Sequence, residues 1–102
     1  MINMTNLRLS KHCTEDRLDR LVRIATTIGF GEVILTSEVR GGRECLTDTG
    51  VVLIKDLYEE FLITAYVIDI NRLTAIYSAH GYTRIPNSIY KTVCRNMRKN
   101  IH

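Results

Sequence analysis

The amino-acid sequence predicts an α+β fold that forms a single domain over residues 1–102. Two amphipathic segments near the ends of the chain have helical spacing, and the segments between them are rich in strand-favouring valine, isoleucine, threonine and tyrosine. Short turns separate these middle segments, which indicates an antiparallel meander of four or five strands. A hydrophobic content of 45% in 102 residues is enough for one core.

The first helix is expected over residues 14–28, where apolar residues recur at helical spacing. These residues are Leu18, Leu21, Val22, Ala25 and Ile28. Glu15 and Asp16 in the first turn interact favourably with the positive end of the helix. Gly29 then ends the helix without a steric penalty.

The strands are expected at EVILTSEV (32–39), ECLTD (44–48), VVLIKD (51–56), FLITAYVID (61–69) and RLTAIYS (72–78). Gly41 and Gly42 can supply the positive φ angles of a two-residue hairpin, and Thr49-Gly50 marks a second turn. The stretch LITAYVI is apolar at both alternating positions. It therefore predicts a central strand that is covered by helix on one side.

A last helix is expected over residues 86–99, because Pro86 is favourable at a helix start. Its apolar stripe is Ile89, Tyr90, Val93, Cys94 and Met97. Its basic residues lie mainly off this stripe and face solvent; they are Lys91, Arg95, Arg98 and Lys99. The predicted architecture is therefore a helix, an antiparallel sheet and a basic helix.

The charges of the chain are distributed unevenly. All 11 acidic residues precede residue 70, whereas the remaining third of the chain contains basic residues and no carboxylate side chain. A segment whose charged side chains are all positive attracts polyanions, RNA first among them, because phosphate contacts release condensed counterions. The alternative is a solvated basic face that only aids solubility, and composition alone favours this alternative.

Several classes of protein are disfavoured by the sequence. No apolar run reaches the roughly 18 residues that span a membrane, and the N-terminus lacks the apolar centre of a secretory signal peptide. The cysteines and histidines have neither disulfide-framework nor metal-ligand spacing; they are Cys13, Cys45, Cys94, His12, His80 and His102. We expect a cytoplasmic protein with reduced thiols, no metal and no cofactor.

Candidate catalytic residues cluster at the start of the first helix. His12 is the histidine best placed for proton transfer near neutral pH. Arg17 and Arg20, with the preceding Lys11, could hold a phosphate and stabilise charge that develops on phosphorus. A structural interpretation is open for each of them: a lone histidine is more often structural, and Arg20 can form an ordinary ion pair with Asp16.

Further candidates lie on the predicted sheet. Thr64 and Tyr66 are two residues apart on one strand, so both side chains point to the same face and could orient a phosphate or a ribose. Both are also simply good strand residues. The stretch RGGR is too short for a phosphate loop, and we interpret it as a hairpin flanked by Arg43. His80 is expected in a turn, in contact with solvent or beside a groove.

In this order, the segments SKHCTEDRLDR, RGGRECLTDTGVVLIKD and FLITAYVID resemble the layout of small metal-independent ribonucleases. These belong to the barnase–EndoU–colicin–RelE superfamily, and the resemblance is strongest to its colicin D-like toxin domains, over roughly residues 9–69. The segment at 72–96 is similar to the tail of small phage and mobile-element proteins of Gram-positive bacteria.

The resemblance implies that His12 is the general acid–base residue and that Arg17, with Lys11 and Arg20, contacts the phosphate. It implies that Thr64, with Tyr66, positions the scissile phosphate. The ribose 2′-hydroxyl would attack and leave a 2′,3′-cyclic phosphate, a reaction that needs no metal and is restricted to RNA. Further substrate contacts would come from Arg43, Lys91 and Arg95.

Three functions are therefore compatible with the sequence. The first is a metal-independent RNA endonuclease, toxin-like or phage-encoded, which an antitoxin could accompany. The second is a non-catalytic phage or mobile-element protein on the same scaffold that binds and inhibits a host protein, as a homodimer through a sheet edge or the last helix. The third is a basic module that binds nucleic acid without cleaving it.

Overall fold

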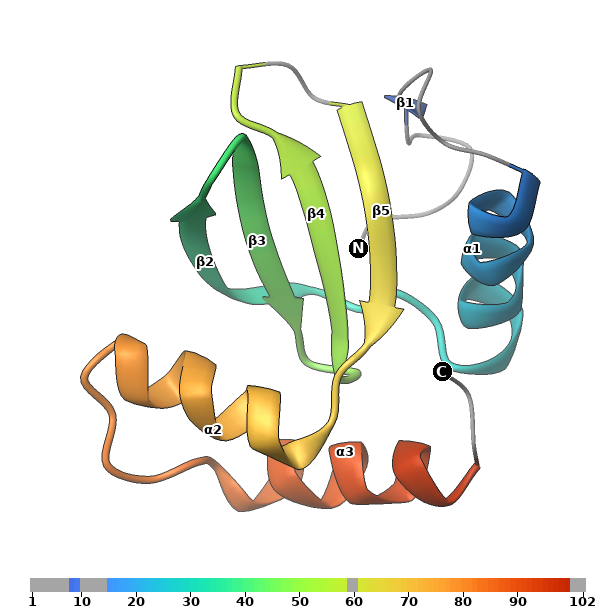
Figure 1. Cartoon of the computed structure of the whole chain (residues 1–102). Coiled ribbons are helices and arrows are strands. Elements are labelled where there is room, and N and C mark those ends of the chain that lie inside the picture. The colour runs from blue at the N-terminus through green and yellow to red at the C-terminus, as the bar shows by residue number, and fades with distance from the viewer. Residues whose placement is uncertain (1–7, 10–14, 59–60, 100–102) are drawn as a thin grey trace.

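The computed structural model describes residues 8–9, 15–58 and 61–99. Within these ranges the elements are β1 (Arg8–Leu9), α1 (Glu15–Thr27), β2 (Val33–Val39), β3 (Gly42–Thr47), β4 (Val51–Asp56), β5 (Phe61–Val67), α2 (Ile70–Ala79) and α3 (Asn87–Arg98). The strands form one sheet in the order β1-β5-β4-β3-β2. Strands β2 to β5 are an antiparallel meander, and β1 pairs parallel with the start of β5 (Figure 1). The predicted α+β fold is confirmed.

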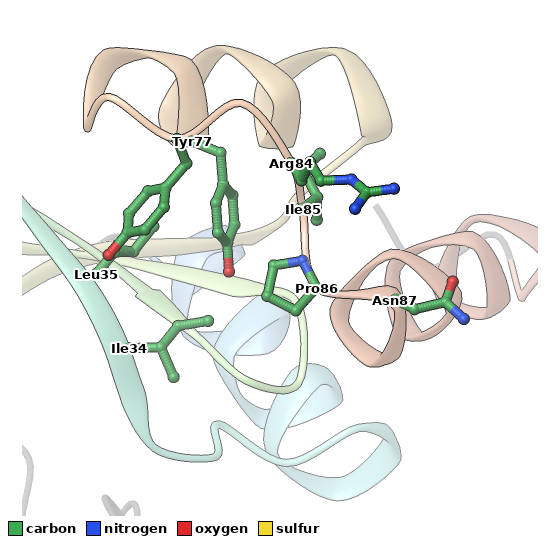
Figure 2. Close-up of a pocket in the computed structure, with 8 residues that line it drawn as sticks. Ile34, Leu35, Tyr77, Arg84, Ile85, Pro86 and Asn87 are labelled. Atoms are coloured by element: carbon green, nitrogen blue, oxygen red, sulfur yellow. The ribbon is translucent and has the colours of Figure 1, made fainter.

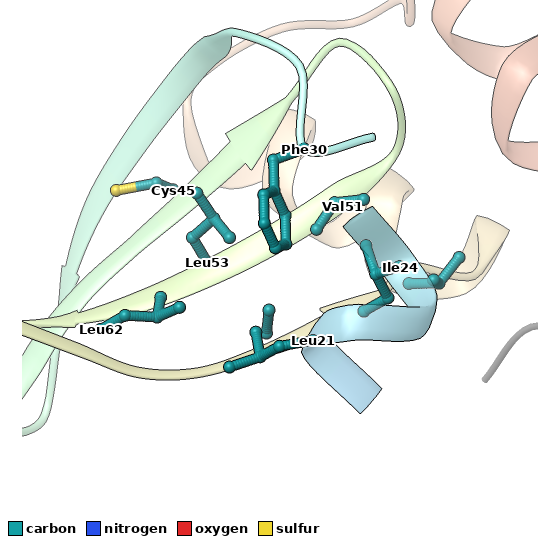
Figure 3. Close-up of a cluster of buried hydrophobic side chains, with 9 residues drawn as sticks. Leu21, Ile24, Phe30, Cys45, Val51, Leu53 and Leu62 are labelled. Atoms are coloured by element: carbon teal, nitrogen blue, oxygen red, sulfur yellow. The ribbon is translucent and has the colours of Figure 1, made fainter. Parts of the chain in front are cut away.

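Helix α1 packs on one face of the sheet, which we call the α1 face. Its side chains at Leu21 and Ile24 are 1% exposed and contact an apolar cluster that includes Phe30 and Leu53 (Figure 3). The predicted stripe was partly wrong, because Leu18 and Val22 are 39% and 45% exposed. The helix packs on the sheet through a narrower stripe, which includes Ile24 in place of Leu18 and Val22.

Side chains of α2 and α3 pack on the opposite face of the sheet, which we call the α2/α3 face. The two helices lie at the end of the sheet where β3 and β5 terminate (Figure 1). Its buried cluster comprises Leu46, Val52, Ile68, Leu73, Ile76, Tyr77, Ile89 and Val93. In α3 the expected Ile89 and Val93 are buried, whereas Tyr90 and Met97 are 43% and 40% exposed. The sheet is therefore covered by helix on both faces, not on one face as predicted.

The segment 72–78 is helical, so the prediction of a strand there was wrong. The Asp69 side chain accepts a 2.8 Å hydrogen bond from the backbone N–H of Arg72 and caps the start of α2. Leu73, Ile76 and Tyr77 are then buried at helical spacing. Capping and packing on the sheet outweigh the strand propensity of isoleucine, threonine and tyrosine at these positions.

The central strand of the sheet is β4, so the central position predicted for LITAYVI was also wrong. Val51, Val52 and Leu53 of β4 are completely buried. Strand β5 lies between β4 and the two-residue β1. It is apolar at both alternating positions because α1 packs on one of its faces and the α2/α3 cluster on the other.

The hairpin between β2 and β3 uses its two glycines differently from the prediction. Gly41 has a positive φ of 81° and forms the turn, whereas Gly42 pairs with Val39 within the ladder. A Cβ atom on Gly42 would lie 2.5 Å from the backbone oxygen of Lys55. The second glycine is therefore required by the close approach of β4, not by the turn.

Candidate nucleic-acid interface

The basic residues of α3 form a row on its outer side. Lys91, Arg95 and Arg98 are exposed and follow one another four and three residues apart, so they are neighbours on the helix surface. The core side of the helix is defined by the buried Ile89 and Val93. We call Lys91, Arg95 and Arg98 the α3 ridge.

The α3 ridge lacks the counter-charges that usually accompany surface arginines. In the part of the chain that the structure describes, no member of the ridge forms an ion pair. The sequence from residue 70 to residue 102 contains no carboxylate side chain that could supply one. Neighbouring like charges repel one another, so an anion bound along the ridge lowers the electrostatic free energy.

A groove lies beside the start of α3, with a volume of about 670 Å³. It is lined by Ile34, Leu35, Tyr77, Tyr82, Arg84, Ile85, Pro86 and Asn87. Figure 2 shows that β2 supplies one wall and the segment that leads into α3 supplies the other. A second hollow of about 620 Å³ shares four of these residues and extends to Tyr90 of α3.

Tyr82 is an exposed aromatic residue in a defined orientation. The residue is 53% exposed, and its ring packs edge-to-face on the buried Tyr77, with the ring centroids 5.6 Å apart. Gly81, with a positive φ of 83°, ends α2, and the backbone N–H of Tyr82 donates a 3.0 Å hydrogen bond to the carbonyl of Tyr77. Tyr82 therefore presents much of its ring to solvent at the junction of the two hollows.

His80 connects the end of α2 to β2 and so fixes the wall of the groove. Its Nδ1 lies 2.9 Å from the carbonyl oxygen of Ile76, and its Nε2 lies 3.2 Å from both the carbonyl oxygen of Thr36 and the hydroxyl of Ser37. The hydrogen bonds to Ile76 and then to Thr36 raise the pKa of His80 above its usual value. The expected position in a turn is confirmed, because His80 lies in the turn that follows α2 and caps this helix.

A second polar cluster lies on the α2/α3 face, around the buried carboxylate of Glu44. The Nη2 atom of Arg72 donates 2.9 Å hydrogen bonds to both oxygens of this carboxylate, and the Tyr66 hydroxyl donates a 3.3 Å bond to one of them. Burial raises the pKa of Tyr66, and the hydrogen bond from Arg72 opposes this effect. The hydrogen bond to Glu44 raises the pKa of Arg72.

The residues predicted to form a cleavage site come from several separate parts of the chain. Lys11 and His12 lie outside the described residues, and Arg17 lies in α1. Thr64 and Tyr66 share the α2/α3 face as expected, because Thr64 pairs with Ile54, which packs there. Lys91 and Arg95 lie on α3.

Arg20 and Arg43 are not brought to Thr64. Arg20 is exposed on α1, and Arg43 is two residues from Cys45, which packs on the α1 face. The sheet therefore separates these two arginines from Thr64 and Tyr66.

The sequence interpretation missed Glu44, Arg72, Tyr82 and Arg84. The signal for Tyr82 and Arg84 is an aromatic residue two positions from an arginine, within the part of the sequence that lacks carboxylates. Arg72 and Glu44 are 28 residues apart, and no local pattern connects them.

In comparisons with known proteins, no protein-family model, no curated protein sequence and no solved structure matches this chain. The resemblance to small ribonucleases therefore stays a prediction. Among the described residues, no helix is long and apolar enough to cross a membrane. The same residues contain no cluster of three or more histidine, cysteine or acidic side chains that could hold a metal ion.

Proposed function

We propose that this protein binds RNA through the α3 ridge. The observation that carries the proposal is the row of Lys91, Arg95 and Arg98, exposed at neighbouring positions with no ion pair among the described residues. Phosphates that contact such a row release counterions, and this release is the main favourable term in sequence-independent binding. The resemblance of residues 9–69 to ribonucleases favours RNA over DNA as the polyanion.

The test is the salt dependence of binding to a short, fluorescently labelled single-stranded RNA in EDTA. We expect the affinity of the unmodified protein to fall steeply between about 50 and 200 mM salt. The double variant Lys91→Gln/Arg95→Gln should bind more weakly at every salt concentration. Its slope of log affinity against log salt should be shallower by about 1.4, because each phosphate contact on a single strand contributes about 0.7.

A matched control separates the ridge from net charge. The double variant Arg23→Gln/Arg40→Gln also removes two exposed positive charges, from α1 and from the β2–β3 turn. It should keep the slope of the unmodified protein. Equal losses in the two double variants would mean that RNA responds to overall charge only, and the proposal would then fail.

Cleavage of the bound RNA is a second proposal, favoured by one specific observation. Thr64 lies on the same face as Tyr66, whose hydroxyl belongs to the cluster with Glu44 and Arg72. Arg72 is 47% exposed, so its guanidinium can reach an anion beside the cluster. The reaction also requires His12 as acid–base residue, as the resemblance implies.

Incubation with total RNA in EDTA tests cleavage independently of binding. Products with 2′,3′-cyclic phosphate ends from the unmodified protein, and none from His12→Ala, would support a metal-independent ribonuclease. Intact RNA in both reactions would remove the cleavage proposal and leave RNA binding in place. A cytoplasmic location belongs to both proposals, since RNA is available there and the free thiols of Cys45 and Cys94 stay reduced.

Inhibition of a host protein, with or without homodimerisation, stays a prediction from the sequence. It becomes the leading hypothesis if RNA of any kind fails to bind at low salt.

A further inference from the structure

We infer that the groove beside Tyr82 binds an unpaired base of the same RNA strand whose phosphates contact the α3 ridge. This inference rests on the proposed function and makes it more specific: the ligand is single-stranded RNA with accessible bases, not duplex RNA. The inference is carried by three features of the groove, namely its exposed aromatic ring, its apolar floor and its continuity with the ridge.

The aromatic feature is Tyr82, which is 53% exposed and oriented by its edge-to-face contact with Tyr77. An exposed ring held in one orientation is suited to stack on a base at a low cost in conformational entropy. Tyr90, which is 43% exposed, lines the adjoining hollow and offers a second ring to the next base. Stacking of this kind tolerates any base sequence, because every base has a flat π-face.

The floor of the groove is apolar where a base would lie. Ile34, Ile85 and Pro86 contribute aliphatic surface around Tyr77 (Figure 2). The neighbouring Leu35 is only partly exposed and closes the groove toward the core. A flat, weakly hydrated base can therefore displace water from this surface, whereas a phosphate cannot profit from it.

The groove continues directly into the α3 ridge. Asn87 lines the groove and is the first residue of α3, and Lys91 follows one helical turn later on the same side. Figure 2 shows the Arg84 guanidinium directed away from Tyr77, toward the side on which Asn87 begins the helix. A strand with one base in the groove would therefore meet cations at its next phosphates.

The charges around the groove distinguish this occupant from an acidic or apolar peptide. Arg84 lines both hollows, and among the residues that the structure describes no carboxylate side chain lines either of them. An acidic peptide would use Arg84 but not the two exposed tyrosine rings, and a purely apolar segment would leave the adjoining cations unpaired. A nucleotide has both a flat ring and a negative charge, and so uses all of these groups.

The decisive comparison is between three labelled ligands of equal length: single-stranded oligouridylate, a ribose-phosphate strand without bases, and a blunt RNA duplex. We expect the full-length protein to bind oligouridylate about 5- to 160-fold more tightly than the base-free strand, the range that stacking of one base typically contributes. The duplex should bind through its phosphates alone and gain no affinity from the groove, because its bases are not accessible.

Variants of Tyr82 test the residue assignment. Tyr82→Ala should lose this preference for strands with bases while it keeps its affinity for the base-free strand, and Tyr82→Phe should keep both. The control is Tyr58→Ala, which removes a tyrosine that is 89% exposed in the turn between β4 and β5. Because the chain contains five tyrosines and no tryptophan, binding of oligouridylate should also quench its tyrosine emission.

The outcomes distinguish failure of this inference about the groove from failure of the proposed RNA binding by the α3 ridge. Equal affinity for oligouridylate and the base-free strand, with Tyr82→Ala indistinguishable from Tyr58→Ala, would overturn this inference and leave the proposed function intact. Failure of all three ligands to bind would overturn both. Concentration-dependent dimerisation that Tyr82→Ala abolishes, measured by light scattering without RNA, would show that the groove is an interface between two copies and would also overturn the inference.

Discussion

The two faces of the sheet differ in what covers them. On the α1 face, the cluster around Leu21, Phe30 and Leu53 consists of hydrocarbon side chains and one cysteine. On the α2/α3 face, a comparable apolar cluster is bordered by polar contacts: the Glu44–Arg72 pair, and His80 against β2. The groove and the α3 ridge are also on this side.

The two faces of the sheet therefore have separable roles. Apolar packing is non-directional and only requires volume and shape, so the α1 face can stabilise the fold without specifying any ligand. Hydrogen bonds and charges require defined geometry, and each costs free energy if its partner is missing. We therefore expect changes on the α1 face to alter stability alone, and changes on the α2/α3 face to alter binding or pH dependence as well.

The largest effect is expected from Leu53→Ala on the α1 face. Leu53 is completely buried, and a truncation of this kind costs about 2–5 kcal/mol of unfolding free energy through lost burial and an unfilled cavity. Urea unfolding measures this loss. Val22→Ala is the matched control, because Val22 is 45% exposed and should change stability by no more than about 0.5 kcal/mol. A folded Leu53→Ala variant with weakened RNA binding would contradict the separation of roles.

A smaller loss is expected from Arg72→Met on the α2/α3 face. The change leaves the carboxylate of Glu44, which is 8% exposed, without its cationic partner. Because Arg72 itself is about half exposed, we expect a loss of about 2–3 kcal/mol, below that of a fully buried pair. The double variant Glu44→Gln/Arg72→Met should recover most of it in urea unfolding at neutral pH. Additive losses would mean that the two residues do not stabilise each other.

The elements that the sequence could predict are those with a local signal. Helices α1 and α3 follow from the periodicity of their apolar residues, and the meander follows from strand-favouring segments between glycine turns. Helix α2 has the same β-branched and aromatic residues as the strands, so residue propensities predict a strand where the structure has a helix. Its helical state depends on the cap from Asp69 and on burial of Leu73 against the sheet, and the latter is decided by tertiary packing.

The candidate interface was predictable in part for the same reason. Lys91 and Arg95 follow from helical spacing within a sequence that lacks carboxylates, and the shared face of Thr64 and Tyr66 follows from the period of a strand. The groove combines residues of β2 with residues that follow α2, and no local pattern connects these parts of the chain. Its existence depends on how α2 lies across the sheet.

A loss of about 1–2 kcal/mol is expected from Asn96→Leu. Asn96 is 3% exposed, and its side-chain amide donates a 2.8 Å hydrogen bond to the carbonyl of Thr49, which ties α3 to the turn before β4. Leucine has a similar volume but leaves this carbonyl without its donor. If the ridge is held in place by this bond, the stability measured by urea unfolding and the affinity for RNA should both decrease. Unchanged RNA affinity would show that α3 keeps its position through Ile89 and Val93 alone.

The smallest effect concerns His80 and depends on pH. Both ring nitrogens lie against carbonyl oxygens, of Ile76 and Thr36, and only the protonated imidazole can donate to both. The folded state therefore raises the pKa of His80 above its usual value of 6.5. Its stabilising contribution should be complete below that value and should decline as the pH rises through the folded-state pKa.

The measurement is urea unfolding of the unmodified protein and of His80→Gln between about pH 5.5 and 8.5, a range that brackets the ordinary histidine pKa. The stability difference between the two proteins should be largest at the acidic end and should shrink as the pH rises. Taking this difference removes the contributions of groups that titrate equally in both proteins. A difference that grows with pH would mean that the neutral ring, accepting from the Ser37 hydroxyl through Nε2, is the form that joins α2 to β2. In that case the contact between α2 and β2 would be most stable at neutral pH. The RNA affinity of the unmodified protein should then fall between pH 6 and 8 by no more than the RNA affinity of His80→Gln falls over the same range.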